Sequence, residues 1–81
     1  MSLHDLLESM KQTEFQIKLG KQIEKLRKQK NITQVAFAYM IDMDKQNLNR
    51  IEKGRTNPTS WTLHQIASAL ELPIQTLFDW D

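Results

Sequence analysis

The stretch from Thr33 to Gly54, TQVAFAYMIDMDKQNLNRIEKG, limits the possible folds of this chain more than any other part of the sequence. Apolar residues recur at helical spacing in both of its halves, and only a four-residue break, Asp42 to Lys45, separates them. Because this break is too short for a loop, the pattern predicts two short helices joined by a tight turn. Thr33 is a favourable N-cap for the first helix and Asp44 for the second, and Gly54 is a favourable residue to end the second helix. The apolar positions expected to face the core are Phe37, Ala38, Ile41, Leu48 and Ile51.

The second of these helices has an unusual polar surface. It carries amide, ammonium and guanidinium groups, which supply many hydrogen-bond donors, and it has no carboxylate before Glu52. By its place on the helical wheel Asn47 leans inward, so we expect a structural role for it. A surface of this kind suits a partner that is rich in hydrogen-bond acceptors. The polar residues are Lys45, Gln46, Asn47, Asn49, Arg50 and Lys53.

The length of 81 residues gives room for one small domain. Its core must be thin, because a chain this short buries only about 60–65% of its unfolded surface. Hydrophobic residues make up 40% and charged residues 26%, as in an ordinary globular protein. There is no Cys for a disulfide or a thiolate metal site, and no long apolar run to span a membrane or direct secretion. We therefore expect a cytoplasmic protein with no membrane association.

The net charge of +1 conceals an uneven distribution along the chain. Residues 18–57 hold ten Lys and Arg against four acidic residues, a balance of +6, whereas residues 1–17 come to −2 and residues 58–81 to −3. Basic charge is thus concentrated on the segment with the two short helices, which favours a polyanionic partner, and the acidic ends should face away from it. Four of the lysines fit the solvated face of a helix better than a binding role: Lys21, Lys25, Lys28 and Lys30.

The N-terminal part of the chain carries two apolar stripes at helical spacing. The first, over residues 1–12, indicates an extra helix or a tail. The second, over residues 13–30, predicts a longer amphipathic helix with Thr13 as its cap. The stripes consist of Leu3, Leu6, Leu7 and Met10, and of Phe15, Leu19, Ile23 and Leu26.

The C-terminal part predicts two more helices. Thr59 is a favourable cap for a fourth helix, and Pro73 fits the first turn of a fifth. No segment shows the signals of a strand. Together the patterns predict an all-α, compact five-helix domain over residues 13–81, preceded by an N-terminal extension over residues 1–12.

Four pieces of the sequence, in this order and at these spacings, resemble the Cro/phage-repressor (XRE-like) family of helix-turn-helix regulators. They are LGKQIEKLRKQKNIT, TQ followed by FA, LNRIEKG, and NP followed by LHQIASALELP. The resemblance implies a repressor-like fold and sequence-specific binding to double-stranded DNA. The family includes the small controller proteins of restriction–modification systems, and this chain resembles them too. This chain departs from the family pattern at Asp42 and Glu71, where the family usually has Gly.

In this family the recognition helix, predicted here over residues 45–53, lies in the DNA major groove with its first residues at the base edges. The resemblance therefore assigns base reading to Lys45, Gln46, Asn49 and Arg50. Their chemistry agrees, because Arg and Lys match the acceptors of guanine, and Gln or Asn matches the edge of adenine. Contacts to the DNA backbone are implied for Thr33, Gln34, Arg55, Thr56 and Asn57.

Two other positions bear on this surface. Arg27 and Glu52 resemble the family's ion pair between the first helix and the recognition helix, which would fix the angle at which that helix is presented. Trp61 stands where relatives are polar. We expect it to pack against the core in preference to contacting DNA.

A homodimer is expected from the energy of recognition. One recognition helix offers two or three base contacts of about 1–3 kcal/mol each, whereas discrimination over a genome needs about 4–10 kcal/mol. A two-fold dimer on a near-palindromic operator doubles the readout. The expected interface lies on the fifth helix and consists of Ile74, Leu77, Phe78 and Trp80.

The sequence thus predicts a transcriptional regulator, and a repressor because no segment is long enough to sense a ligand. We expect no enzyme, cofactor or metal, because His4 and His64 lie far apart and the motifs of known active sites are absent. The alternative is an antitoxin-like protein-interaction module with secondary DNA binding, which would use the apolar N-terminal stripe and the C-terminal FDWD to cover a protein partner.

Overall fold

We describe the fold from a computed structural model, which describes residues 2–80, with the side chains of all of these except residues 6–10. Four α-helices and one 3-10 helix follow one another, and no strand occurs among residues 2–80. The fold is all-α, as predicted. The helices are α1 (Leu3–Gln29), α2 (Gln34–Met40), α3 (Lys45–Glu52), α4 (Ser60–Leu70) and the 3-10 helix η1 (Ile74–Phe78).

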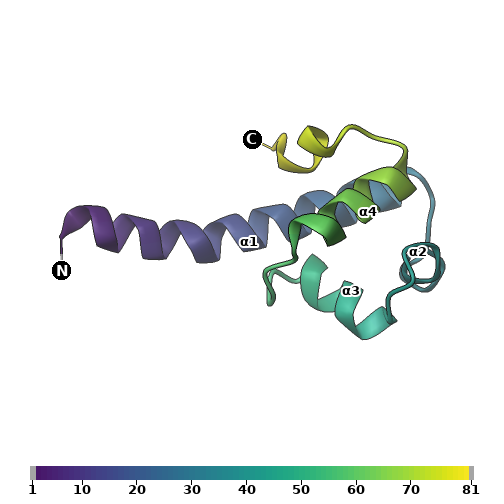
Figure 1. Cartoon of the computed structure of the whole chain (residues 1–81), viewed down its shortest axis with the longest axis horizontal. Helices are drawn as coiled ribbons and strands as arrows, with labels where there is room; N and C mark the ends of the chain where they lie inside the picture. Colours follow the sequence, from purple (N-terminus) through teal and green to yellow (C-terminus); the bar gives the residue numbers. More distant parts are fainter. Residues whose placement is uncertain (1, 81) are drawn as a thin grey trace.

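The first helix, α1, is unbroken over 27 residues, and its N-terminal part projects beyond the rest of the domain (Figure 1). The domain therefore measures 44 Å in one direction but 23 and 20 Å in the others. Ser2 caps α1, and its hydroxyl accepts from the N–H of Asp5 at 3.1 Å. The predicted cap at Thr13 is wrong, because good helix formers on both sides of this residue continue the helix through it.

The side chains of Leu6, Leu7 and Met10, three residues of the first predicted stripe, lie outside the described part of the structure. The backbone of residues 3–12 is helical and continuous with the rest of α1. None of the described helices is both long and apolar enough to cross a membrane.

The two short helices with a tight turn are α2 and α3. Thr33 caps α2 and Asp44 caps α3, and each side chain accepts from the backbone N–H three residues on at 3.1 Å. Within the turn, the N–H of Met43 donates to the carbonyl of Ala38 at 2.9 Å. Both of these predicted caps are confirmed, as is the cap of α4 at Thr59.

Every junction between successive helices contains one residue in the left-handed conformation. The φ angles are +59° at Asn31, +52° at Asp42, +72° at Gly54 and +59° at Glu71. Glycine adopts this conformation without strain, and asparagine and aspartate adopt it more readily than glutamate. Asp42 and Glu71, which stand where the family pattern usually has glycine, thus adopt a conformation that glycine favours.

The core lies between α1, α2, α3 and α4, with η1 closing one side (Figure 1). Phe37, Ala38, Ile41, Leu48 and Ile51 are all buried, as predicted. Phe15 lies at the edge of the predicted stripe of α1 and is 42% exposed. The other buried hydrophobic residues are Leu19, Ile23, Leu26, Ile66, Ala67, Leu70 and Leu77.

The C-terminal segment is a 3-10 helix held against α1. The side chain of Gln22, which is buried in α1, donates through Nε2 to the carbonyls of Thr76 at 3.0 Å and Asp79 at 3.1 Å. Leu77 has no exposed surface and belongs to the core of the monomer. Its assignment to a dimer interface is therefore wrong, because a side chain covered by its own subunit cannot meet a second one.

Aromatic rings connect the C-terminal segment to α1. Phe15 stacks on Phe78 with ring centroids 6.0 Å apart, and it meets the edge of Trp80 at 5.5 Å. Ile74 and Phe78 remain 40% and 37% exposed, so this end of the domain keeps an apolar surface.

Candidate nucleic-acid interface

The third helix, α3, separates its apolar and polar residues cleanly. Leu48 and Ile51 are buried against the core, which turns the opposite side of the helix to solvent. Lys45, Gln46 and Arg50 are exposed on that side, and Asn49 is half-buried. The helix therefore presents its donor-rich face outward, as an element that enters a DNA groove must.

These residues gather around one open hollow on the surface. Its lining consists of Gln34, Lys45, Gln46, Asn49, Arg50 and Arg55. All four predicted base readers are present, together with two of the residues predicted to hold the DNA backbone. The lining contains three cations and no carboxylate, so its electrostatics favour an anion.

The loop after α3 forms an adjoining hollow. Thr56 and Asn57 line it together with Arg50 and Asn47, so Arg50 belongs to both hollows. Thr33 lies at the start of α2 beside Gln34 and does not line either hollow. Its hydroxyl accepts from the N–H of Ala36 and keeps its own proton to donate.

Asn47 departs from the helical-wheel prediction, because its side chain is exposed. The core side of α3 is filled by Leu48 and Ile51, and Asn47 falls at the margin of that side, next to Arg50. The burial of Leu48, Ile51 and Glu52 sets the rotation of this short helix, and that rotation leaves Asn47 at the surface. Asn47 is thus an exposed polar residue that lines a hollow together with Arg50, and the prediction of an inward-leaning side chain was wrong.

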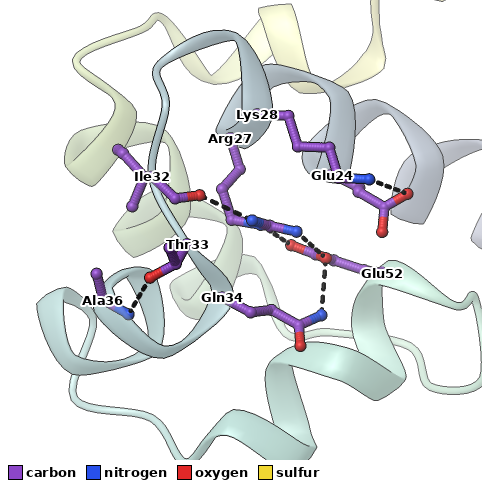
Figure 2. A network of polar contacts seen from close by, with 8 residues as sticks. All are labelled: Glu24, Arg27, Lys28, Ile32, Thr33, Gln34, Ala36 and Glu52. Carbon is purple, nitrogen blue, oxygen red and sulfur yellow. Dashed lines mark hydrogen bonds and ion pairs between the residues drawn. The ribbon is translucent and has the colours of Figure 1, made fainter.

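Arg27 of α1 and Glu52 of α3 form the expected ion pair (Figure 2). Arg27 donates from Nε to Oε2 of Glu52 at 2.7 Å and from Nη2 to Oε1 at 2.9 Å, a bidentate arrangement with both side chains buried. Its third contact runs from Nη1 to the carbonyl of Ile32 at 2.8 Å. The hydrogen bond to Glu52 raises the pKa of Arg27 above its already high ordinary value, against the opposing effect of burial.

Gln34 extends this network to α2. Its Nε2 donates to Oε1 of Glu52 at 2.9 Å, so the carboxylate accepts from two different helices (Figure 2). The side chain predicted to contact phosphate is thus already engaged within the protein.

Trp61, at the start of α4, does not pack into the core. It is 66% exposed, and its ring lies against that of His64 with centroids 5.4 Å apart. The prediction that Trp61 packs inside was wrong, because residues further along α4 fill the core at this place. The two rings border a hollow on the α2–α4 side together with Met40, Gln65, Ser68 and Ala69.

Two short helices with a tight turn, the second of them presenting a donor-rich and cationic face, define a helix-turn-helix DNA-binding domain. The buried ion pair between Arg27 and Glu52 attaches the second of these helices to α1. The chain belongs to the HTH_3 helix-turn-helix family, which matches residues 23–77. It is a DNA-binding regulator of transcription.

The relatives of this chain carry names from DNA regulation. It is 33% identical to the control protein C.MunI of a Mycoplasma species over 66 residues, which cover 80% of this chain and 89% of the relative. It is 32% identical to the immunity repressor protein of Bacillus phage phi105 over 59 residues, which cover 73% of this chain but only 41% of that repressor.

Solved structures show the same fold. The restriction–modification controller protein C.AhdI of Aeromonas hydrophila superposes with a TM-score of 0.75 at 26% identity, over 76% of this chain and 94% of the controller. An HTH_3 family transcriptional regulator of Vibrio cholerae gives a TM-score of 0.78 at 33% identity, over 83% of this chain and 38% of that regulator. About a quarter of the present chain thus has no counterpart in the superposition with C.AhdI.

Proposed function

We propose that this protein is a sequence-specific repressor of transcription that inserts α3 (Lys45–Glu52) into the major groove of double-stranded DNA. The observation that carries the proposal is the single hollow around which Lys45, Gln46, Asn49 and Arg50 gather. Arg50 matches the O6 and N7 acceptors of guanine in a bidentate way, and Lys45 matches the same acceptors. Gln46 and Asn49 match the N6 and N7 of adenine.

The DNA backbone is held by residues on either side of the recognition helix. Arg55 supplies a cation at the edge of the hollow, and Thr56 and Asn57 supply neutral polar groups next to it. The hydroxyl of Thr33 has a proton to donate at the start of α2. For Gln34 the bond to Glu52 leaves one side-chain N–H free, so any contact of this side chain with phosphate is limited to that group.

The active species is a two-fold homodimer. One helix with two or three base contacts falls short of the discrimination that a genome demands, whereas two copies on a near-palindrome reach it. The interface uses Ile74, Phe78 and Trp80 without Leu77. The C-terminal segment that carries this apolar surface is acidic, which favours a position of the interface away from the phosphates of the DNA.

The class of regulator that fits best is the small controller type, because C.MunI and C.AhdI match over 89% and 94% of their own lengths. A protein of this class acts where the DNA is, in the cytoplasm, and it carries out no chemical reaction. The partners of this chain in that role are double-stranded DNA and a second copy of itself.

Selection of bound sequences from a random duplex library tests the proposal. We expect the enriched sites to be near-palindromes whose half-site centres lie about 34 Å apart, one turn of DNA. Recovered sequences without any shared element would contradict sequence-specific recognition. A single shared half-site without its inverted copy would contradict the two-fold dimer alone.

A further inference from the structure

Gln34 connects the two helices of the helix-turn-helix at their open end. It is the first residue of α2, and Glu52, which accepts from its Nε2 at 2.9 Å, is the last residue of α3. At the other end the two helices are joined by the turn, where the N–H of Met43 donates to Ala38. The pair of helices is therefore fixed at both ends, by backbone at the turn and by a side-chain bond across the opening.

The carboxylate at the far end of this bond is itself buried and bonded to a second residue. The side chain of Glu52 is fully buried, and the fork of Arg27 holds both of its oxygens. Arg27 also donates to the carbonyl of Ile32, two residues before α2 begins. The position of Gln34 relative to α3 is thus set by a network that contacts the chain just before α2, the start of α2 and the end of α3 (Figure 2).

The chemistry of Glu52 also sets the orientation of the Gln34 amide. A carboxylate only accepts hydrogen bonds, so the NH₂ of Gln34 must face it, and the amide oxygen points away (Figure 2). Gln34 lines the hollow of the base readers together with Lys45 and Arg50. A carbonyl oxygen in that place repels a phosphate oxygen, whereas it is a suitable neighbour for cationic side chains.

We infer that Gln34 is a positioning residue for sequence recognition: it braces the angle between α2 and α3 through Glu52, and it contributes to specificity more than to general affinity for DNA. The inference rests on the proposed base reading by α3. It differs from a phosphate-contact role for Gln34 in a measurable way. A phosphate contact strengthens binding to all sequences, whereas a brace acts where the reading groups must meet particular bases.

The test compares Gln34→Met with wild type on the selected operator and on a scrambled duplex of equal length. Methionine has a similar shape and no donor. We expect the ratio of non-specific to specific Kd to fall about tenfold, as for the loss of a hydrogen bond to a charged group. Affinity for the scrambled duplex and the salt slope should stay as in wild type. Gln29→Met is the matched control, because Gln29 is exposed on α1 and does not line the hollow.

A second variant, Gln34→Lys, restores a donor for Glu52. Because its added charge strengthens binding to every sequence, it is compared by library selection, in which its base preferences should be sharper than those of Gln34→Met. The inference is overturned if Gln34→Met weakens specific and non-specific binding equally, since that is the behaviour of a phosphate contact. It is also overturned if the ratio is unchanged in Gln34→Met, or if the base preferences of Gln34→Lys are as relaxed as those of Gln34→Met. A wild type that shows no preference for any sequence would contradict the proposed base reading itself, a different outcome from these three.

Discussion

Gly20 of α1 lies directly against the backbone of Glu52 at the end of α3. A Cβ atom at residue 20 would lie 2.6 Å from the carbonyl oxygen of Glu52 and would also collide with the carbonyl oxygen of Ile51. The atoms that it would meet belong to the backbone of the recognition helix, which cannot give way as a flexible side chain does. The absence of a side chain at residue 20 thus allows α1 and α3 to approach closely enough for Arg27 to reach Glu52.

Replacing Gly20 by Ala should therefore destabilise the domain, although Ala favours a helix more than Gly does. We expect a net loss of about 1–3 kcal/mol in the free energy of unfolding, the range typical of overpacking. Urea unfolding followed by circular dichroism measures it. Lys18→Ala, at an exposed position on the same helix, should stay within about 0.5 kcal/mol of wild type. An unchanged midpoint for Gly20→Ala would mean that α1 and α3 can separate freely.

The buried pair of Arg27 and Glu52 should behave differently from an exposed pair. Arg27→Met or Glu52→Leu alone leaves a buried charge without a partner, so each should cost about 3–5 kcal/mol of stability. The double variant should lose less than either single one, because no charge is stranded. The surface pair of half-buried Glu24 and exposed Lys28, 3.8 Å apart on α1, is the control, and its removal should change stability by less than about 1 kcal/mol.

Arg55 should act on DNA of any sequence. Each neutralised phosphate contributes about −0.9 to the slope of log K against log salt concentration, so Arg55→Ala should make that slope less negative by about this amount. Affinity should fall by the same factor for the operator and for a scrambled duplex. Titration at several salt concentrations measures both quantities, with Lys25→Ala of α1 as the control. A loss confined to the operator would indicate that Arg55 reads a base.

Arg50 should act on particular sequences. Arg50→Ala is expected to cost about 1–3 kcal/mol on the operator and to relax the preference at one or two positions of each half-site. Repeating the library selection with the variant shows which positions lose their preference. Lys53→Ala, at the end of α3 and outside both hollows, is the control. Equal weakening at every site would assign Arg50 to the DNA backbone.

Ile74 and Leu77 lie three residues apart in η1 and should separate assembly from folding. Ile74 is 40% exposed, so Ile74→Asp should abolish the dimer while the monomer stays folded. Leu77 is fully buried, so Leu77→Ala should cost about 2–5 kcal/mol of stability and leave the dimer intact below the unfolding transition. Sedimentation and thermal unfolding distinguish the two effects. Gln75→Asp adds the same charge at an exposed neighbour and should change neither, and a wild type that binds its operator as a monomer would rule out the dimer.

The parts of the fold that depend on local chemistry could be predicted from the sequence. The caps at Thr33, Asp44 and Thr59 follow from side-chain oxygens placed three residues before free backbone N–H groups, a relationship contained in a few consecutive residues. The buried side of α3 likewise follows from the spacing of Leu48 and Ile51. The failure at Thr13 has the same origin, because a good capping residue inside a strong helix gives the same local signal.

The parts that depend on distant residues could not be predicted in this way. The bond from Gln34 to Glu52 joins residues 18 apart, and no pattern in the sequence indicates that a predicted phosphate contact is taken up by a buried carboxylate. The burial of Leu77 depends on how η1 packs against α1 and α4. The exposure of Trp61 depends on which residues of α4 pack into the core. At these positions the arrangement of the helices determines which side chains are buried, exposed or bonded. The spacing of the residues in the sequence does not determine it.

The left-handed residues at the helix junctions are positions at which a substitution can stabilise this domain. A residue other than glycine loses about 1–2 kcal/mol in this conformation, and glycine in its place loses about 0.5–1 kcal/mol through entropy. The net gain from glycine should be largest at Glu71 and smaller at Asn31 and Asp42, and none of the three lines the hollow of the base readers. If the recognition helix acquires a new set of reading residues that lowers the stability of the domain, one substitution at a distant helix junction can offset that loss. Specificity can therefore evolve without loss of the fold.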